Sequence, residues 1–203
     1  MQTRMSSRKY ILAIFASGAW CLTAFGMFLP WVTVTIKLCI LSICLPEIKI
    51  YSSQTTFLQF LVPVNISEIL PTLNHYVVSF IASNFFPLFN QYLLLLTRAA
   101  YVLFGSVIVL LPTLIVFALQ TRGSFTPHRI TAAFALVVSF VGLVAMYETV
   151  QIVTAIQQHV QGARTSLGGG FWMIGTGFAL IGLLMLWQLL KGSADIYREK
   201  QCL

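Results

Sequence analysis

Few residues of this sequence could carry chemistry: it holds four cysteines, three histidines and five carboxylates. His75, His128 and His159 are scattered, and no His-x3-His spacing gathers ligands for a metal. No pair of nucleophile and base stands out either. We therefore predict a non-catalytic protein without a metal or cofactor. One alternative is open, because a single histidine among aromatic residues could ligate a haem or a pigment.

Cys39 and Cys44 are the two cysteines whose spacing allows a disulfide. They lie in a segment that we place outside the membrane below, where disulfides persist. A bond between them requires the chain to turn between the two positions. We predict this disulfide, with two buried free thiols as the alternative.

Arg98 and Glu148 are the charged residues nearest to the apolar segments, each at a predicted outer boundary. Charged groups at such depth are usually paired or functional. We predict an ion pair between them that clamps two helices. A gate or a solute contact is the second interpretation.

The composition excludes a soluble domain. Only 8% of the residues are charged and 58% are hydrophobic, whereas about 25% of a soluble domain is charged. The solvent for most of the chain is therefore lipid. The net charge of +7 does not indicate nucleic-acid binding, because no basic stripe with interleaved aromatic residues is present.

Four apolar runs are long enough to cross a bilayer as helices, at about 10–34, 93–119, 130–150 and 170–190. The first lacks a clear cleavage site, so we interpret it as a membrane helix rather than a signal peptide. Eight of the twelve Lys and Arg residues fall on the side of the two termini. The sequence thus predicts an all-α, multi-pass protein of the cell membrane with both termini in the cytoplasm.

Small residues recur at helical spacing in the third and fourth runs, a pattern that lets neighbouring helices approach closely. The third run carries Ala132, Ala135, Ser139 and Gly142, and the fourth carries Gly175, Ala179 and Gly182. We predict that these stripes pack a four-helix bundle.

The outer loop over 37–92 is the only large piece outside the predicted spans. Residues 32–38 and 47–52 alternate apolar with polar side chains, which predicts a small β-hairpin or sheet. The third helix should continue as a projection over 148–160. Segment 76–89 is apolar but short, and we interpret it as an interfacial helix or a partner contact; a fifth span is the alternative. Its phenylalanines are Phe80, Phe85, Phe86 and Phe89.

Three short motifs resemble those of the claudin-like tetraspan superfamily, which includes claudins and peripheral myelin proteins. They are Leu29-Pro30-Trp31-Val32-Thr33, Arg98-Ala99-Ala100 and Leu167-Gly168-Gly169-Gly170-Phe171-Trp172. The resemblance implies four spans, a sheet in the first outer loop and a projecting third helix. The Gly-Leu-Trp signature with two widely spaced cysteines is absent, and the chain ends in Cys202-Leu203. Barrier or pore function is therefore not implied, and the motifs also look like those of uncharacterised bacterial four-span proteins, the version that we favour.

These features favour a structural or accessory subunit that assembles with itself or with a larger membrane complex. The apolar outer loop and the helix faces would supply the contacts, with Trp31 and Trp172 fixing the bundle at the outer interface. The alternative is a small transporter or channel, which requires polar side chains facing a shared interior. The candidates for that interior are Thr23, Ser106, Thr113, Ser139 and Thr176.

Overall fold

The computed structural model describes residues 2–36, 39–40, 43–44, 48–49, 86–120, 125–159 and 163–201. These residues form the helices α1 (Gln2–Gly26), α3 (Phe86–Leu119), α4 (Phe125–His159) and α5 (Gly169–Gln201), together with short strands. The chain divides into two compact units, which we describe separately. The first comprises Met1–Phe25, Leu103–Val144 and Met173–Leu203, and the second Gly26–Val102 and Ala145–Trp172.

Three of the helices contain stretches long and apolar enough to cross a membrane: Leu94–Leu119, Arg129–His159 and Gly169–Lys191. The predicted membrane character is therefore confirmed. The described apolar part of α1, Ile11–Gly26, is shorter. α1 also ends earlier than the expected limit near residue 34. The Leu29 amide closes a turn onto the Gly26 carbonyl at 3.2 Å, and Pro30 cannot continue a helix.

α3 and α4 are longer than a bilayer requires. They contain 34 and 35 residues, which at 1.5 Å per residue is about 50 Å, against about 30 Å of hydrocarbon. α4 runs on to His159, and α3 begins at Phe86. Phe86 and Phe89 therefore belong to the first turns of α3 rather than to a separate element, while Phe80 and Phe85 lie outside the described residues.

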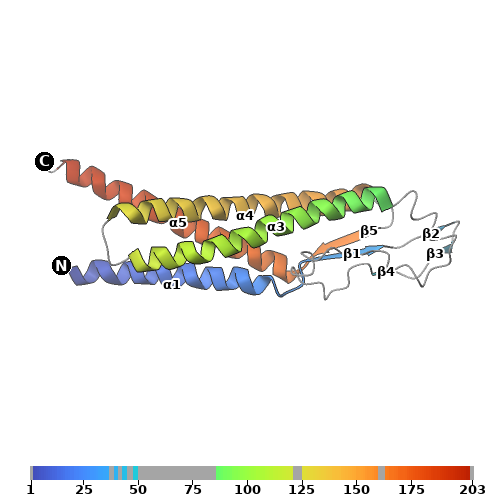
Figure 1. The fold of residues 1–203 in the computed structure, drawn as a ribbon, viewed down its shortest axis with the longest axis horizontal. Coiled ribbons are helices and arrows are strands. Elements are labelled where there is room, and N and C mark those ends of the chain that lie inside the picture. Colours follow the sequence, from blue (N-terminus) through green and yellow to red (C-terminus); the bar gives the residue numbers. More distant parts are fainter. Residues whose placement is uncertain are drawn as a thin grey trace. The chain divides into compact units, whose positions relative to one another are not determined.

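A three-stranded antiparallel sheet belongs to the second unit. Its order is β4 (Ile48–Lys49), β1 (Val32–Ile36), β5 (Ala163–Leu167), with β1 in the middle (Figure 1). β1 pairs with β4, the two segments predicted to form a hairpin, so the expected small sheet is confirmed. β5 was not predicted, because its sequence, Ala-Arg-Thr-Ser-Leu, contains no Val, Ile or aromatic residue and has Thr165 as its one β-branched residue. It nevertheless pairs with β1 over all five residues.

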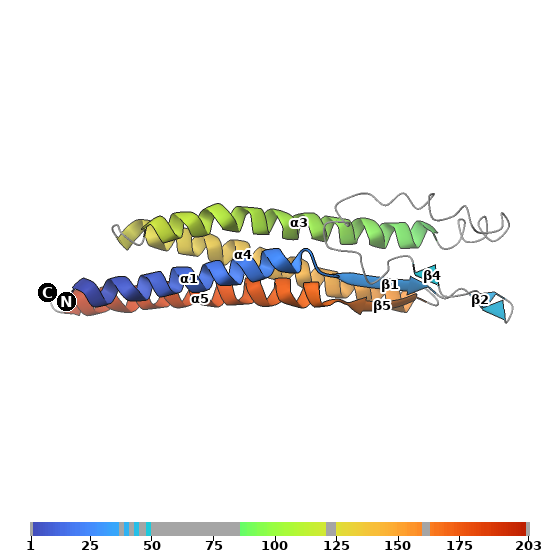
Figure 2. The same ribbon diagram turned by 90° about the horizontal axis from the view of Figure 1, so that it is seen from below.

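In the first unit, α1 and α5 approach most closely at Gly177. The Thr23 hydroxyl donates to the Ala19 carbonyl at 2.9 Å, and this turn of α1 faces Gly177. A Cβ atom at Gly177 would overlap Thr23 Oγ1 and lie 2.8 Å from the Ala19 carbonyl oxygen. Figure 2 shows the two helices side by side. This crossing depends on the absence of a side chain at Gly177.

The small residues of α4 lie at its contact with α5. Ala132, Ala135 and Ser139 are fully buried. A Cβ atom at Gly142 would meet the Phe178 ring at 2.7 Å, and one at Gly182 would lie 3.7 Å from Ser139 Cβ. On α5 the predicted stripe is only half-buried at Gly175 and Ala179. The buried face of α5 runs instead through Ile174, Gly177, Phe178, Ile181 and Met185.

Pro112 lies inside α3, where it supplies no amide for the Ile108 carbonyl. Side chains bond to the carbonyls on either side of this position. The Trp20 indole donates to Val107 O at 3.0 Å, and the Thr113 hydroxyl donates to Val109 O at 2.7 Å. The first of these bonds ties α1 to α3 where the proline weakens the backbone ladder.

The α1–α5 crossing gives a direct stability test. We expect Gly177→Ala to lower the free energy of unfolding by about 1–3 kcal/mol, the usual cost of overpacking, because the new methyl group meets backbone as well as the Thr23 hydroxyl. Gly18→Ala is the matched control, since nothing lies within 4 Å of a Cβ atom there. Unfolding of both variants in mixed SDS and mild detergent measures the difference. Equal stability would contradict this packing.

Candidate functional site

The residues that follow α1 and those that open α5 are joined backbone to backbone. The Gly168 amide donates to the Trp31 carbonyl at 2.8 Å, and the Gly170 amide donates to the Pro30 carbonyl at 2.9 Å. A Cβ atom at Gly170 would lie 2.5 Å from the Gly26 carbonyl oxygen, and one at Gly168 would overlap the Pro30 carbonyl. We call this arrangement, formed by Pro30, Trp31, Gly168 and Gly170, the exit clamp. Only glycine allows the two backbones to come so close.

Two tryptophans near the exit clamp have different environments. Trp31 is fully buried, so it is a core residue rather than the interfacial anchor that the sequence predicted. Trp172 is 62% exposed and its ring meets Phe171 edge to face, with centroids 5.5 Å apart. An exposed tryptophan at the beginning of an apolar helix is typical of the membrane interface. Trp172 alone therefore fits the predicted anchoring role.

Two of the three claudin-like motifs, the Pro-Trp exit and the Gly-rich entry, meet in the exit clamp. This proximity follows from the antiparallel pairing of β1 with β5, which places Val32 opposite Leu167. The chain matches no protein-family model, curated protein or solved structure. The claudin-like relationship thus stays a prediction based on short motifs, and the site has to be argued from its own geometry.

α4 supports the sheet beyond the exit clamp. The Thr165 hydroxyl, on β5, lies 3.3 Å from the Val153 carbonyl oxygen and 3.5 Å from Gln157 Oε1. Val153 and Ile156 are buried on the same side of α4. The His159 end of α4 is therefore held against β5 by both hydrogen bonding and apolar burial.

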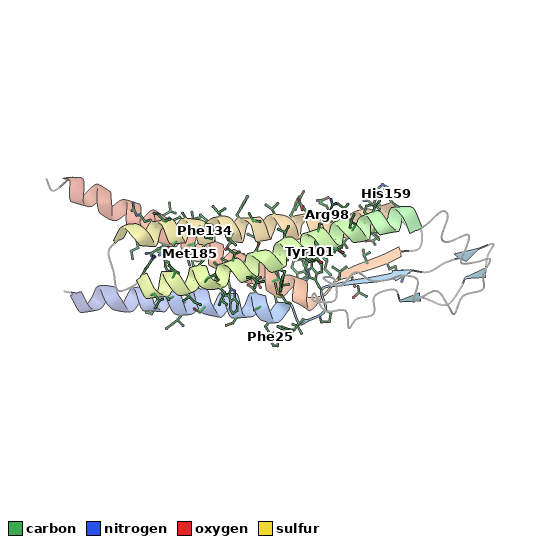
Figure 3. The ribbon with its side chains drawn as sticks, in the orientation of Figure 1. Phe25, Arg98, Tyr101, Phe134, His159 and Met185 are labelled. Carbon is green, nitrogen blue, oxygen red and sulfur yellow. The ribbon has the colours of Figure 1, made fainter. Side chains whose placement is uncertain are left out.

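The Phe86 end of α3 runs beside the His159 end of α4. The rings of Tyr92 and His159 are tilted, with centroids 6.4 Å apart, and His159 Nδ1 lies 3.0 Å from the Ala155 carbonyl oxygen. His159 is exposed (Figure 3). The His159 ring thus contacts the backbone of its own helix. Among the described residues, no second ligand accompanies it that would complete a metal or haem site.

Exposed side chains on α4 change character along the helix. Val137, Val141 and Val144 are exposed and apolar, whereas Glu148, Gln151 and Gln158 are exposed and polar. Such a change is what a helix shows where one of its faces passes from hydrocarbon to water.

The exposed side chains of α3 do not show this change from apolar to polar. Leu94 and Leu95 are 54% and 43% exposed, although the antiparallel contact of Tyr92 with His159 places them level with Ile156 and Gln157 of α4. At that level the exposed side chains of α4 are glutamines. Leu94 and Leu95, which we call the leucine patch, therefore present apolar surface where α4 presents polar surface.

Arg98 and Glu148 do not form the predicted ion pair. Both side chains are exposed, and neither pairs with another side chain that the structure describes. If Tyr92 of α3 is taken as level with His159 of α4, Arg98 is level with Val153. Glu148 lies about five residues from Val153 toward the Phe125 end of α4, a distance of about 7 Å along the helix. The buried face of α3 passes through Leu96, Ala99 and Ala100, so Arg98 (Figure 3) points away from the bundle.

Hydroxyl groups in the helices bond to their own backbone. Thr23, Thr113 and Ser139 each donate to the carbonyl four residues earlier, at 2.7–2.9 Å, and so does Thr149, which the sequence did not single out. Thr176 is exposed and bonds to Met173 O. Ser106 is buried and is not free of partners. Four of the five residues proposed to line a polar interior are therefore satisfied within single helices.

Among the residues that the structure describes, no group of three or more His, Cys, Asp or Glu side chains could hold a metal. His75 lies outside the described residues, and His128 lies on α4 with its side chain outside them. The described part of the chain thus offers packing and apolar surface rather than a reactive cluster.

Cys39 and Cys44 occupy directly opposed positions. β2 (Cys39–Ile40) pairs antiparallel with β3 (Ile43–Cys44), in a register that sets Cys39 against Cys44. Opposed residues in such a pair have Cα atoms about 4.5–5.5 Å apart, within the range of about 4.4–6.8 Å that a disulfide needs. The antiparallel pairing of β2 with β3 therefore provides the chain reversal that the predicted disulfide requires.

The exit clamp can be tested by adding one methyl group. We expect Gly170→Ala to lower the free energy of unfolding by about 1–3 kcal/mol, because the carbonyls of Gly26, Leu29 and Pro30 that it meets are backbone atoms. Gly169→Ala is the control, since nothing lies within 4 Å of its Cβ position. Mixed-detergent unfolding of both variants checks this. A destabilised Gly169→Ala beside an unaffected Gly170→Ala would refute the clamp.

The disulfide prediction is tested by alkylation. Protein made in an oxidising compartment should leave Cys39 and Cys44 unmodified until it is reduced, and intact mass and peptide mapping report the change. Cys21 is an internal control, because it is a free and exposed cysteine. Alkylation of Cys39 and Cys44 without a reductant would show that they are thiols.

Proposed function

We propose that this chain is a non-catalytic four-span protein of the cell membrane that acts as a structural or assembly subunit. Association, either with a second copy or with a larger membrane complex, would involve the Phe86 end of α3 and the His159 end of α4. In this topology both termini are cytoplasmic and the sheet lies on the outer side.

The leucine patch is the observation that carries the proposal. Leu94 and Leu95 expose apolar surface level with the glutamines of α4. The apolar stretch that these leucines open, Leu94–Leu119, has 26 residues and a length of about 39 Å, against about 30 Å of hydrocarbon. Its first residues would therefore lie beyond the lipid, where apolar surface favours contact with protein. Complete burial of one leucine side chain contributes about 1.5–3 kcal/mol. Two leucines thus suffice to stabilise an association substantially.

The contacts of α1 support a fourth span. Trp20 bonds to Val107 of α3, and Thr23 meets Gly177 of α5. Both partners lie well inside the long apolar stretches of their helices. The packing of α1 against the interior of two such stretches supports the proposal that α1 lies in the membrane with them.

The hydroxyl groups argue against the transporter alternative. A transport pathway needs polar groups that are free to replace the hydration of a solute. Thr23, Thr113 and Ser139 instead donate to carbonyls of their own helices, so their protons are directed at the backbone.

Light scattering in mild detergent tests the assembly. The wild-type protein should elute as a species larger than one chain in its micelle. Replacing both Leu94 and Leu95 with Ala should weaken association about tenfold, taking about 0.7 kcal/mol for each leucine because about half of each side chain is already buried. Leu183→Ala is the control, because Leu183 is also exposed but lies near the middle of the apolar stretch of α5 rather than at its end.

A single-chain wild-type species would overturn the assembly proposal. If such a protein also carried solute flux in liposomes, the transporter alternative would take its place. An equal loss of association in Leu183→Ala would move the contact from the leucine patch to the lipid-facing side of the helices.

A further inference from the structure

Arg129 stands out in the first unit because part of its guanidinium is buried without a partner. Its Nε and Nη2 atoms are inaccessible to solvent, and they donate no hydrogen bond to any group that the structure describes. Buried donors of a charged group are costly to leave unpaired, because each has lost its hydration. The guanidinium of Arg129 therefore requires a hydrogen-bond acceptor, and a negatively charged acceptor fits best.

The register of α4 and α5 brings a second cation to the same level. Gly142 lies against Phe178, and Gly182 lies against Ser139. Counting along the antiparallel helices from these two contacts places Arg129 level with residues 191–192. Lys191 is exposed there. The long apolar stretches of the two helices end at Arg129 and at Lys191, so both cations lie where hydrocarbon gives way to headgroups.

No described side chain neutralises this pair. Neither Arg129 nor Lys191 forms an ion pair with another residue whose side chain the structure describes. Two like charges at one level of neighbouring helices repel each other at low dielectric. An anion between them would remove that repulsion and accept the unpaired guanidinium bonds.

We infer that Arg129 and Lys191 bind the headgroup phosphate of an acidic phospholipid. A guanidinium presents a planar fork to phosphate oxygens, and basic sites between helices at the membrane surface suit anionic headgroups. Trp187, one helical turn before Lys191, is 63% exposed and offers the aromatic ring that is typical of the headgroup region. The net charge of +7 favours an acidic lipid over a zwitterionic one.

Native mass spectrometry of the full chain tests this site. In mixed micelles with equal phosphatidylglycerol and phosphatidylcholine, the wild-type protein should retain phosphatidylglycerol preferentially. Arg129→Gln and Lys191→Gln should each reduce that preference about fivefold, the effect of one basic residue near an anionic surface. Arg98→Gln is the matched control, since Arg98 is also exposed and unpaired among the described side chains but lies outside the site. It should leave the preference unchanged.

Three results would overturn the inference. One is equal retention of the two lipids by the wild-type protein. Another is loss of the phosphatidylglycerol adduct on adding excess inorganic phosphate alone, which would assign the site to free phosphate. The third is an unchanged lipid preference in both Arg129→Gln and Lys191→Gln, because the bound lipid would then lie elsewhere. Lys191→Gln keeps the test decisive if Arg129→Gln fails to fold, since Lys191 is exposed.

Discussion

The exit clamp is the constraint on which the second unit depends. Two amide-to-carbonyl bonds, from Gly168 to Trp31 and from Gly170 to Pro30, fix where the chain leaves α1 and where it enters α5. Both bonds require glycine, because a Cβ atom at either position would overlap backbone atoms of the opposite segment. Once these residues are joined, β1 and β5 have one register available, and Trp31 is enclosed. The register of β1 with β5 therefore follows from the bonds of the exit clamp.

Hydropathy and alternation predicted much of the fold, since both report directly on burial. The long apolar helices and the pairing of β1 with β4 followed from them. Features that depend on two distant segments did not follow. Gly177 was missed because its importance comes from Thr23 on another helix. The Arg98–Glu148 pair failed because a sequence locates a membrane boundary only to within a turn or two, whereas an ion pair needs agreement within about 4 Å.

The two units expose different kinds of surface. In the first, the hydroxyl groups of Thr23 and Ser139 donate to carbonyls of their own helices, and the large exposed side chains are mostly apolar, as lipid requires. In the second, polar and apolar side chains are exposed at the same level of α3 and α4. Mixed polar and apolar exposure of this kind is typical of surfaces that bind other proteins. That contrast, more than any single residue, supports the assembly proposal.

The pairing of β1 with β5 also has a consequence for biogenesis. β1 is made early, but the strand that completes its other edge follows about 130 residues later. Until β5 has been made, β1 has β4 on one side and an unpaired edge on the other. The unpaired edge of a strand can form hydrogen bonds with a strand of another chain. The nascent chain is therefore most vulnerable to mispairing between the synthesis of β1 and that of β5.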